Sequence, residues 1–207
     1  AFGIAPGPAA LADYAAALGI AAVSPALTFP GATLLADCGY ARLARGPAVL
    51  IADAGEIGPD YLPGHAHADT LSFELSLFGR RVVVNSGTSE YGLGAERLRQ
   101  RGTAAHSTVQ VDGADSSEVW SGFRVARRAR PQDLQLAAQD DALILSCAHD
   151  GYRRLPGRPL HRREWRLGAK ALRVTDTIEG GFGEAVARYH LHPAVAATGE
   201  GSAGELR

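Results

Sequence analysis

Cysteine is scarce in this sequence, whose 207 residues include only Cys38 and Cys147. Their separation does not match the short Cys-x-x-Cys spacing of cysteine-based zinc sites, so they give no sign of such a site. The two cysteines either pair with each other or both stay free. The sequence leaves both alternatives open, and with them the redox compartment.

Long apolar runs and a strong net charge are also missing. No stretch is long enough to cross a membrane, and the net charge is −1, so no overall field attracts nucleic acid. We therefore expect neither a membrane span nor a nucleic-acid partner. The charge is uneven, because residues 153–173 hold eight Arg or Lys and one Glu. This segment forms either a basic surface for an anionic partner or a solvated strand edge.

Glycine is abundant, with 25 Gly and 11 Pro, and it separates short segments with strand-like alternation. Strands are expected at residues 32–37, 40–45, 48–52, 71–78, 81–85, 106–111, 122–128, 134–137, 142–147, 162–167, 171–178 and 186–192. Short strands at regular spacing, with Gly and Asp at the turns, predict a mainly β protein built as an antiparallel β-sandwich.

Two segments depart from the strand pattern. Residues 9–22 are rich in Ala and Leu at helical spacing and predict one short helix that ends before Pro25. Residues 86–102 are polar and rich in Gly, which predicts a long surface loop of the kind that often carries function.

Two histidines and a carboxylate, His65, His67 and Asp69, stand within five residues. If this stretch is extended, both imidazoles point to the same side, where they suit a metal site or a proton-transfer site. A metal needs further ligands, and His67, Asn85 and His106 can converge if their strands are neighbours. The plainer alternative is a hydrogen-bonded histidine pair that joins two strands.

Other catalytic motifs fit less well. A cupin places a Glu a few residues after its His-x-His motif, whereas Glu74 follows His67 by seven residues. A cupin-like metal enzyme with Glu74 in its metal shell is therefore kept as an alternative. Ser86 lacks the Gly-x-Ser-x-Gly context of a hydrolase nucleophile. Gly92 and Gly94 lack the third glycine and the βα context of a phosphate-binding loop.

Several spaced motifs together resemble the C-terminal β-sandwich region of heparinase II/III-like polysaccharide lyases. They are Gly64-His65-Ala66-His67-Ala68-Asp69 with Ser72-Phe73, Asn85-Ser86-Gly87 with Tyr91, and His106-Ser107-Thr108 with Val111-Asp112-Gly113. Segments around residues 149–152 and 189–193 are also similar to bacterial members. The resemblance runs from about residue 32 to the end of the chain.

This resemblance implies a two-part enzyme in which an (α/α) toroid precedes the β-sandwich and a cleft lies between them. Residues 1–30 would then be a helical remnant of the toroid, and residues 31–207 a β-sandwich domain truncated at its C-terminus. The implied activity is β-elimination on an acidic, uronic-acid-containing polysaccharide such as a glycosaminoglycan or alginate. The implied location is the periplasm or cell envelope.

The resemblance also assigns roles to individual residues. It implies that His65 is catalytic and that His67 and His106 bind one structural zinc, with the third ligand at Asn85, where family members often have Asp. Tyr91, Arg97 and Arg101 are expected to bind substrate, since arginine binds carboxylates and sulfates well. The alternative function is a non-catalytic carbohydrate-binding or structural β-module, which would have no need of one particular imidazole.

Overall fold

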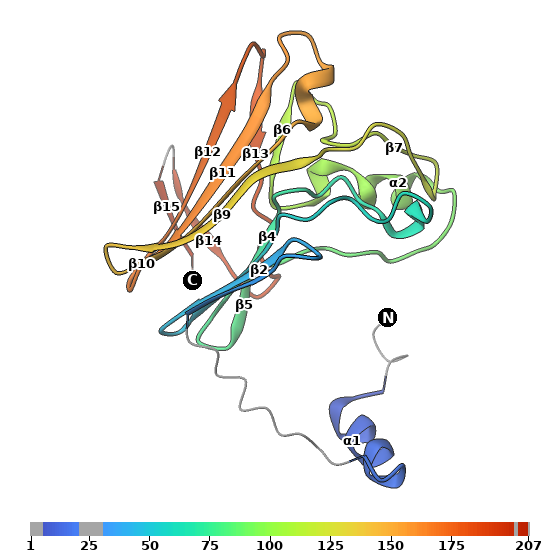
Figure 1. Cartoon of the computed structure of the whole chain (residues 1–207), viewed down its shortest axis with the longest axis vertical. Helices are drawn as coiled ribbons and strands as arrows, with labels where there is room; N and C mark the ends of the chain where they lie inside the picture. Colours follow the sequence, from blue (N-terminus) through green and yellow to red (C-terminus); the bar gives the residue numbers. More distant parts are fainter. Residues whose placement is uncertain (1–5, 21–30, 201–202, 207) are drawn as a thin grey trace.

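A five-stranded antiparallel sheet forms the first layer of the fold (Figure 1), in a computed structural model that describes residues 6–20, 31–200 and 203–206. Its strands are β1 (Gly31–Leu35), β2 (Tyr40–Arg45), β3 (Ala48–Asp53), β4 (Phe73–Leu77) and β5 (Arg80–Val83). They lie side by side in sequence order. Tight turns make this arrangement possible: Gly46 and Gly79 adopt left-handed backbone conformations that glycine enters without steric cost.

A four-stranded antiparallel sheet forms the second layer. It contains β9 (Pro131–Gln139), β10 (Ala142–His149), β11 (Leu160–Leu167) and β12 (Leu172–Glu179), in the order β12-β11-β10-β9. The turn from β9 to β10 uses Asp140 and Asp141, both with positive φ, as a two-residue hairpin of this twist requires.

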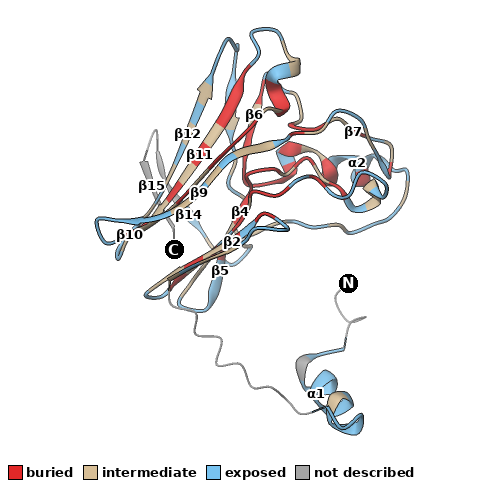
Figure 2. Ribbon diagram, viewed as in Figure 1, coloured by how far each residue is buried: buried red, intermediate tan, exposed pale blue. Residues whose placement is uncertain are grey.

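The main core lies between these two sheets, where buried side chains of both pack into one cluster (Figure 2). Phe73 of the first sheet meets Trp165 of the second edge to face, with ring centroids 6.3 Å apart. Leu43 and Leu50 belong to the same cluster as Leu145, and all three are fully buried. The apolar faces therefore cover each other, and the predicted β-sandwich is confirmed.

Short elements complete the described part of the chain. Three strand pairs are formed by β6 (Val109–Val111) with β13 (Ala185–Ala187), β7 (Val119–Trp120) with β8 (Arg124–Val125), and β14 (Ala197–Glu200) with β15 (Ala203–Leu206). Three 3-10 turns are η1 (Pro63–His65), η2 (Thr103–Ala105) and η3 (Gly151–Arg154). No helix in the described ranges is long and apolar enough to cross a membrane.

The two helices differ from the sequence-based expectation. The first, α1 (Pro8–Ala17), ends earlier than predicted because Gly19 takes a left-handed conformation and the Gly19 and Ile20 N–H groups bond back into the last turn. The second, α2 (Ala95–Arg101), lies in the segment predicted to be loop. Residues 21–30, which include Pro25, lie outside the described residues, so the domain boundary near residue 30 stays a prediction.

Several strands are shorter than predicted. The strand expected at 71–78 begins at Phe73, because Leu71 is held in a left-handed conformation with φ of 64°. Only Arg124–Val125 is strand within 122–128, and only Ala185–Ala187 near 186–192. The cysteines do not pair: Cys38 is exposed and Cys147 is buried, and both are free.

Candidate functional site

His65 is at the end of η1 and its imidazole is exposed. The Tyr91 hydroxyl lies 3.4 Å from His65 Nδ1, and the two rings meet edge to face with centroids 5.7 Å apart. The 3-10 turn replaces the extended stretch that the sequence suggested. His65 and His67 therefore have different environments, and His65 is the more accessible of the two.

His67, Asp69 and His106 converge on one point. Each offers one ligand atom, and these three atoms all lie within 4.8 Å of one another. The two imidazole rings are 5.2 Å apart at their centroids. His67 and Asp69 come from the loop after η1, and His106 follows η2, where its backbone is extended toward β6. The two imidazoles lie against each other, but no hydrogen bond joins them as the plainer alternative supposed, and a carboxylate stands with them.

The His106 side chain is fully buried, yet neither of its ring nitrogens has a hydrogen-bond partner. Burial lowers its pKa to about 3, so the ring is neutral at pH 7. A buried polar group without a partner is costly, and in native proteins it often marks a missing ion or water. A neutral imidazole with free nitrogens is the form in which histidine binds metal.

The other two members of the cluster also suit a cation. Burial lowers the His67 pKa to about 4, and its Nε2 lies 3.2 Å from both Thr88 Oγ1 and Arg97 NH1. Burial raises the pKa of Asp69 well above its usual range, and the neighbouring Asp53 raises it further. A divalent cation would offset that cost and restore the carboxylate. Two imidazoles and a carboxylate are a common zinc donor set, so the residues fit this metal.

Asn85 and Glu74 are placed differently from the sequence-based expectations. The Asn85 side chain accepts a hydrogen bond from the Gly87 N–H at 3.0 Å, and Asp69 stands in the cluster with the two histidines. Glu74, which a cupin-like site would require, forms an ion pair with Arg81. Asp69, from the motif that first drew attention, is therefore the third candidate ligand in the described structure.

Arg97 and Arg101 are fully buried on α2, unlike the solvent-facing arginines that substrate binding would require. Arg97 donates to the carbonyl oxygens of Gly64 and Gly122, and Arg101 to that of Ala66. Their guanidinium groups thus fix the backbone on both sides of His65 by hydrogen bonds to its carbonyl oxygens. The sequence could not show this, because a polar, Gly-rich segment gave no sign of a helix with a buried face.

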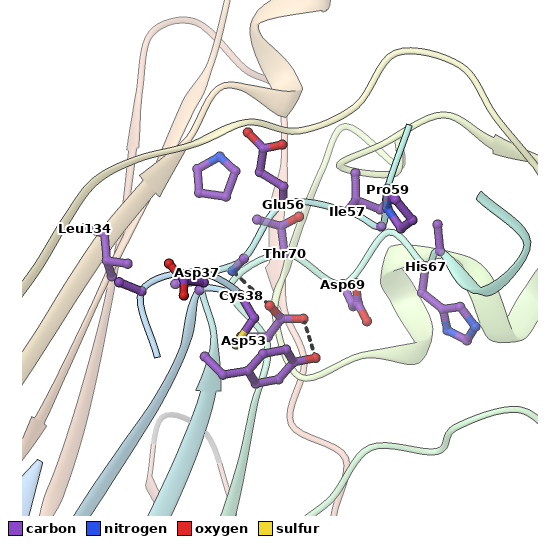
Figure 3. A pocket seen from close by; sticks show the side chains of 18 of the residues that line it. Asp37, Cys38, Asp53, Glu56, Ile57, Pro59, His67, Asp69, Thr70 and Leu134 are labelled. Carbon is purple, nitrogen blue, oxygen red and sulfur yellow. Dashed lines mark hydrogen bonds between the residues drawn. The ribbon is translucent and has the colours of Figure 1, made fainter. Parts of the chain in front are cut away.

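An open pocket of about 860 Å³ lies between the end of the first sheet and the start of β9, next to the histidines (Figure 3). Five carboxylates line it, namely those of Asp37, Asp53, Glu56, Asp69 and Asp133. None of the described lining residues is Arg or Lys. In Figure 3, Asp69 lies between Asp53 and His67, and Asp53 accepts a hydrogen bond from the Tyr40 hydroxyl. The charged side chains that line the pocket are therefore carboxylates, with His65 and His67 beside them.

Sequence reasoning overlooked Arg163, although one signal was present. On β11, alternation puts Arg163 on the same face as Trp165 and Leu167, where an apolar residue is expected. Arg163 is fully buried and forms a two-point ion pair with Asp176. An arginine at an inward strand position therefore marks a buried polar network behind the site.

Comparisons with solved structures give the fold. A mutant of heparan sulfate lyase HepC from Pedobacter heparinus matches 78% of this chain at 21% identity, with a TM-score of 0.59. A heparinase III gene product matches 83% at 19% identity and a TM-score of 0.61, and another heparinase III structure matches 77% at 19% and 0.54. The chain spans about a quarter of their lengths, 24%, 26% and 25% respectively.

The comparison with curated proteins found no match. The profile of the heparinase II/III-like, C-terminal family matches residues 30–206, which is most of the chain. The described histidine motifs lie within this range, as does the whole β-sandwich. The chain therefore belongs to the heparinase II/III-like, C-terminal family.

Proposed function

We propose that this chain is the β-sandwich part of an enzyme that cleaves a uronic-acid polysaccharide by β-elimination. One observation carries the proposal: the exposed His65, in contact with the Tyr91 hydroxyl, stands beside a cluster of the half-buried His67 and Asp69 with the buried His106. Family membership supports it, as do the solved neighbours whose titles name them as heparan sulfate lyase or heparinase.

The chemistry requires a group that moves a proton near neutral pH. The C5 proton of a uronate lies α to a carboxylate and is only weakly acidic. A base removes it, the C5–H electrons form the C4–C5 double bond, and the C4–O bond breaks as the leaving oxygen gains a proton. Stabilising charge on the uronate carboxylate favours this transition state.

His65 is the residue of this chain placed to take part in that transfer. Its imidazole is exposed, and histidine is the side chain that most often transfers protons in enzymes. The contact from Tyr91 orients the ring through Nδ1, which leaves Nε2 to face a substrate. The remaining catalytic groups of the reaction would come from a preceding α-helical toroid domain of the same polypeptide.

The cluster would hold one zinc ion through His67, Asp69 and His106. When bound, the metal supplies structural cross-linking between the histidine loop and the segment before β6. Without the metal, the three ligand side chains are not cross-linked. The loop that carries His65 would then be held less firmly. The expected periplasmic or cell-envelope location is part of the same proposal and is tested by cell fractionation.

The test uses the full-length polypeptide that carries these residues, as wild type, as His65→Ala and as His192→Ala. His192 is the matched control. It is a partly buried histidine far from His65 in the sequence, and its Nδ1 accepts a hydrogen bond from the Ala194 N–H. Each protein is incubated with heparan sulfate, heparin and alginate. The ultraviolet absorbance of the conjugated C4–C5 double bond is then followed, because elimination forms this chromophore and hydrolysis does not.

We expect wild type and His192→Ala to produce the chromophore on at least one polymer and His65→Ala to produce almost none. Activity that survives in His65→Ala would contradict the role of His65 and leave the elimination reaction standing. No chromophore from folded wild type on any of the polymers would contradict the lyase and favour a non-catalytic carbohydrate-binding module.

A further inference from the structure

The hairpin formed by β7 and β8 is very short but unusually well supported. Each of its strands has two residues, and Ser121 in its turn has a left-handed backbone. Arg101 donates to the carbonyl oxygens of Trp120 at 3.4 Å, of Ser121 at 3.0 Å and of Arg124 at 3.0 Å. Arg97 donates to that of Gly122 at 3.2 Å. Two fully buried guanidinium groups thus fix four of five consecutive carbonyls.

This hairpin lies beside His65. The same Arg97 and Arg101 bond to the carbonyls of Gly64 and Ala66 on either side of that histidine. A Cβ placed on Gly64 would lie 3.8 Å from the Phe123 ring, in ordinary contact. A Cβ on Gly122 would lie 2.0 Å from the Gly92 carbonyl oxygen, which shows how closely the hairpin turn approaches the Tyr91 segment.

The hairpin presents aromatic and cationic groups to solvent. Trp120 is 51% exposed and Phe123 is 42% exposed, in a chain with only two tryptophans. The Arg124 guanidinium lies over the Trp120 ring, 5.2 Å from its centroid, so the cation is held in a defined position.

Arg124 also differs from the other arginines of its segment. These pair with carboxylates: Arg127 with Glu118, Arg128 with Asp60, and Arg130 with Glu56. Arg124 has no ion pair among the described residues and its side chain is exposed. Its positive charge is therefore available to an external anion.

We propose that the β7–β8 hairpin is a subsite for an acidic sugar, with Arg124 binding a carboxylate or sulfate group and Trp120 and Phe123 contacting the sugar ring. The pocket that His65 also lines contains no Arg or Lys among its described lining residues, whereas the hairpin offers the guanidinium group of Arg124 to a polyanion. A rigid support lowers the entropic cost of binding. The inference rests on the proposed function for the identity of the sugar polymer.

The test measures binding of a size-fractionated heparan sulfate hexasaccharide to the full-length polypeptide by calorimetry, at low and at physiological salt. The variants are Trp120→Ala and Arg124→Gln. The matched controls are Phe78→Ala and Arg80→Gln, an exposed aromatic in the β4–β5 turn and an exposed arginine at the start of β5. Thermal melting checks that all four variants are folded, and the rate of double-bond formation is measured in parallel.

We expect Trp120→Ala and Arg124→Gln each to weaken binding about tenfold, and both controls to stay within about twofold of wild type. Arg124→Gln should also reduce the salt dependence, since it removes one screened charge. Unchanged affinity in both hairpin variants, or no binding by wild type, would overturn the subsite. Loss of binding in these variants with no elimination by wild type would keep the subsite and contradict the lyase.

Discussion

Arg163 and Asp176 stand opposite each other in the register of β11 and β12, and their side chains form a two-point ion pair with distances of 2.7 and 2.9 Å. The remaining Arg163 nitrogen donates to the carbonyl oxygens of Leu71 at 2.8 Å and Ser107 at 2.7 Å. Leu71 follows Asp69 by two residues, and Ser107 follows His106. One buried guanidinium thus ties the second sheet to both segments that carry the candidate metal ligands.

Replacing Arg163 by Lys should destabilise the fold. An ammonium group cannot make both bonds to Asp176 and reach both carbonyls, so a buried acceptor is left unpaired. We expect the free energy of unfolding to fall by about 3 kcal/mol, measured by urea denaturation. Arg173→Lys, at an exposed position on β12, is the control and should cost less than about 0.5 kcal/mol. Equal effects of the two changes would contradict this role of Arg163.

Zinc binding should depend on Asp69 and not on Asn85. We expect the wild-type protein to retain about one zinc per chain and to melt at a lower temperature after chelation. Asp69→Asn and His106→Gln should lower zinc affinity by about 100-fold or more, measured by competition with a chromophoric chelator. Asn85→Ala should keep its zinc, because the Asn85 side chain bonds the Gly87 N–H. Loss of zinc in Asn85→Ala alone would restore the ligand set expected from the resemblance.

Arg101 should matter for stability rather than for direct contact with substrate. Arg101→Lys removes bonds to the buried carbonyl of Ala66 and to part-buried carbonyls of the β7–β8 hairpin. The unpaired buried carbonyl alone costs about 1 kcal/mol or more. Thermal melting should show a clear loss. Arg99→Lys is the matched control on the same helix, because Arg99 is exposed and forms its ion pair with Glu96 of that helix. An Arg101→Lys protein that melts like wild type but binds substrate poorly would favour the original expectation.

Tyr91 is expected to act through His65. Tyr91→Phe removes the hydroxyl 3.4 Å from His65 Nδ1 and leaves the exposed ring in place. If His65 moves a proton in the reaction, kcat of the full-length enzyme should fall about tenfold with little change in KM. Tyr61→Phe, at a position 87% exposed, serves as the control. A rise in KM at constant kcat would instead assign Tyr91 to substrate binding, as the sequence suggested.

The stability of the sandwich should fall in mild acid because of a buried histidine chain. His149 Nδ1 accepts the Gly151 N–H, so its Nε2–H points to His161 Nδ1 at 3.1 Å, and His161 Nε2–H donates to Asp176 at 2.7 Å. Burial lowers the pKa of His149 well below its usual value and also lowers that of His161. Both rings are therefore neutral in the folded state.

The lowered pKa of His149 determines the direction in which pH changes the free energy of unfolding. Below about pH 6.5 the unfolded chain takes up a proton at His149 that the folded chain does not, so acid favours unfolding. We expect His149 to contribute a loss of about 1.4 kcal/mol per pH unit between pH 6 and 5. The pH dependence of unfolding should be shallower in His149→Gln, and identical slopes in the two proteins would contradict the assignment.

Much of the architecture could be predicted from the sequence. Alternation along β2, β3 and β11 reflects a local geometric rule, because successive side chains on a strand face opposite sides. Short turns then make neighbouring strands pair in order. The spaced motifs around His65, Asn85 and His106 were specific enough to suggest the family that the profile confirms. These features depend on local sequence, so they can be predicted from a single sequence.

Tertiary packing alone decided the composition of the site. Asp69 joins His67 and His106 because the loop after η1 and the segment after η2 are held together by long-range bonds, and no local pattern specifies such a distance. The burial of Arg97 and Arg101 depends on the carbonyls of a hairpin some twenty residues away. The sequence determined which residues could do chemistry, and the packing of distant segments determined which of them meet.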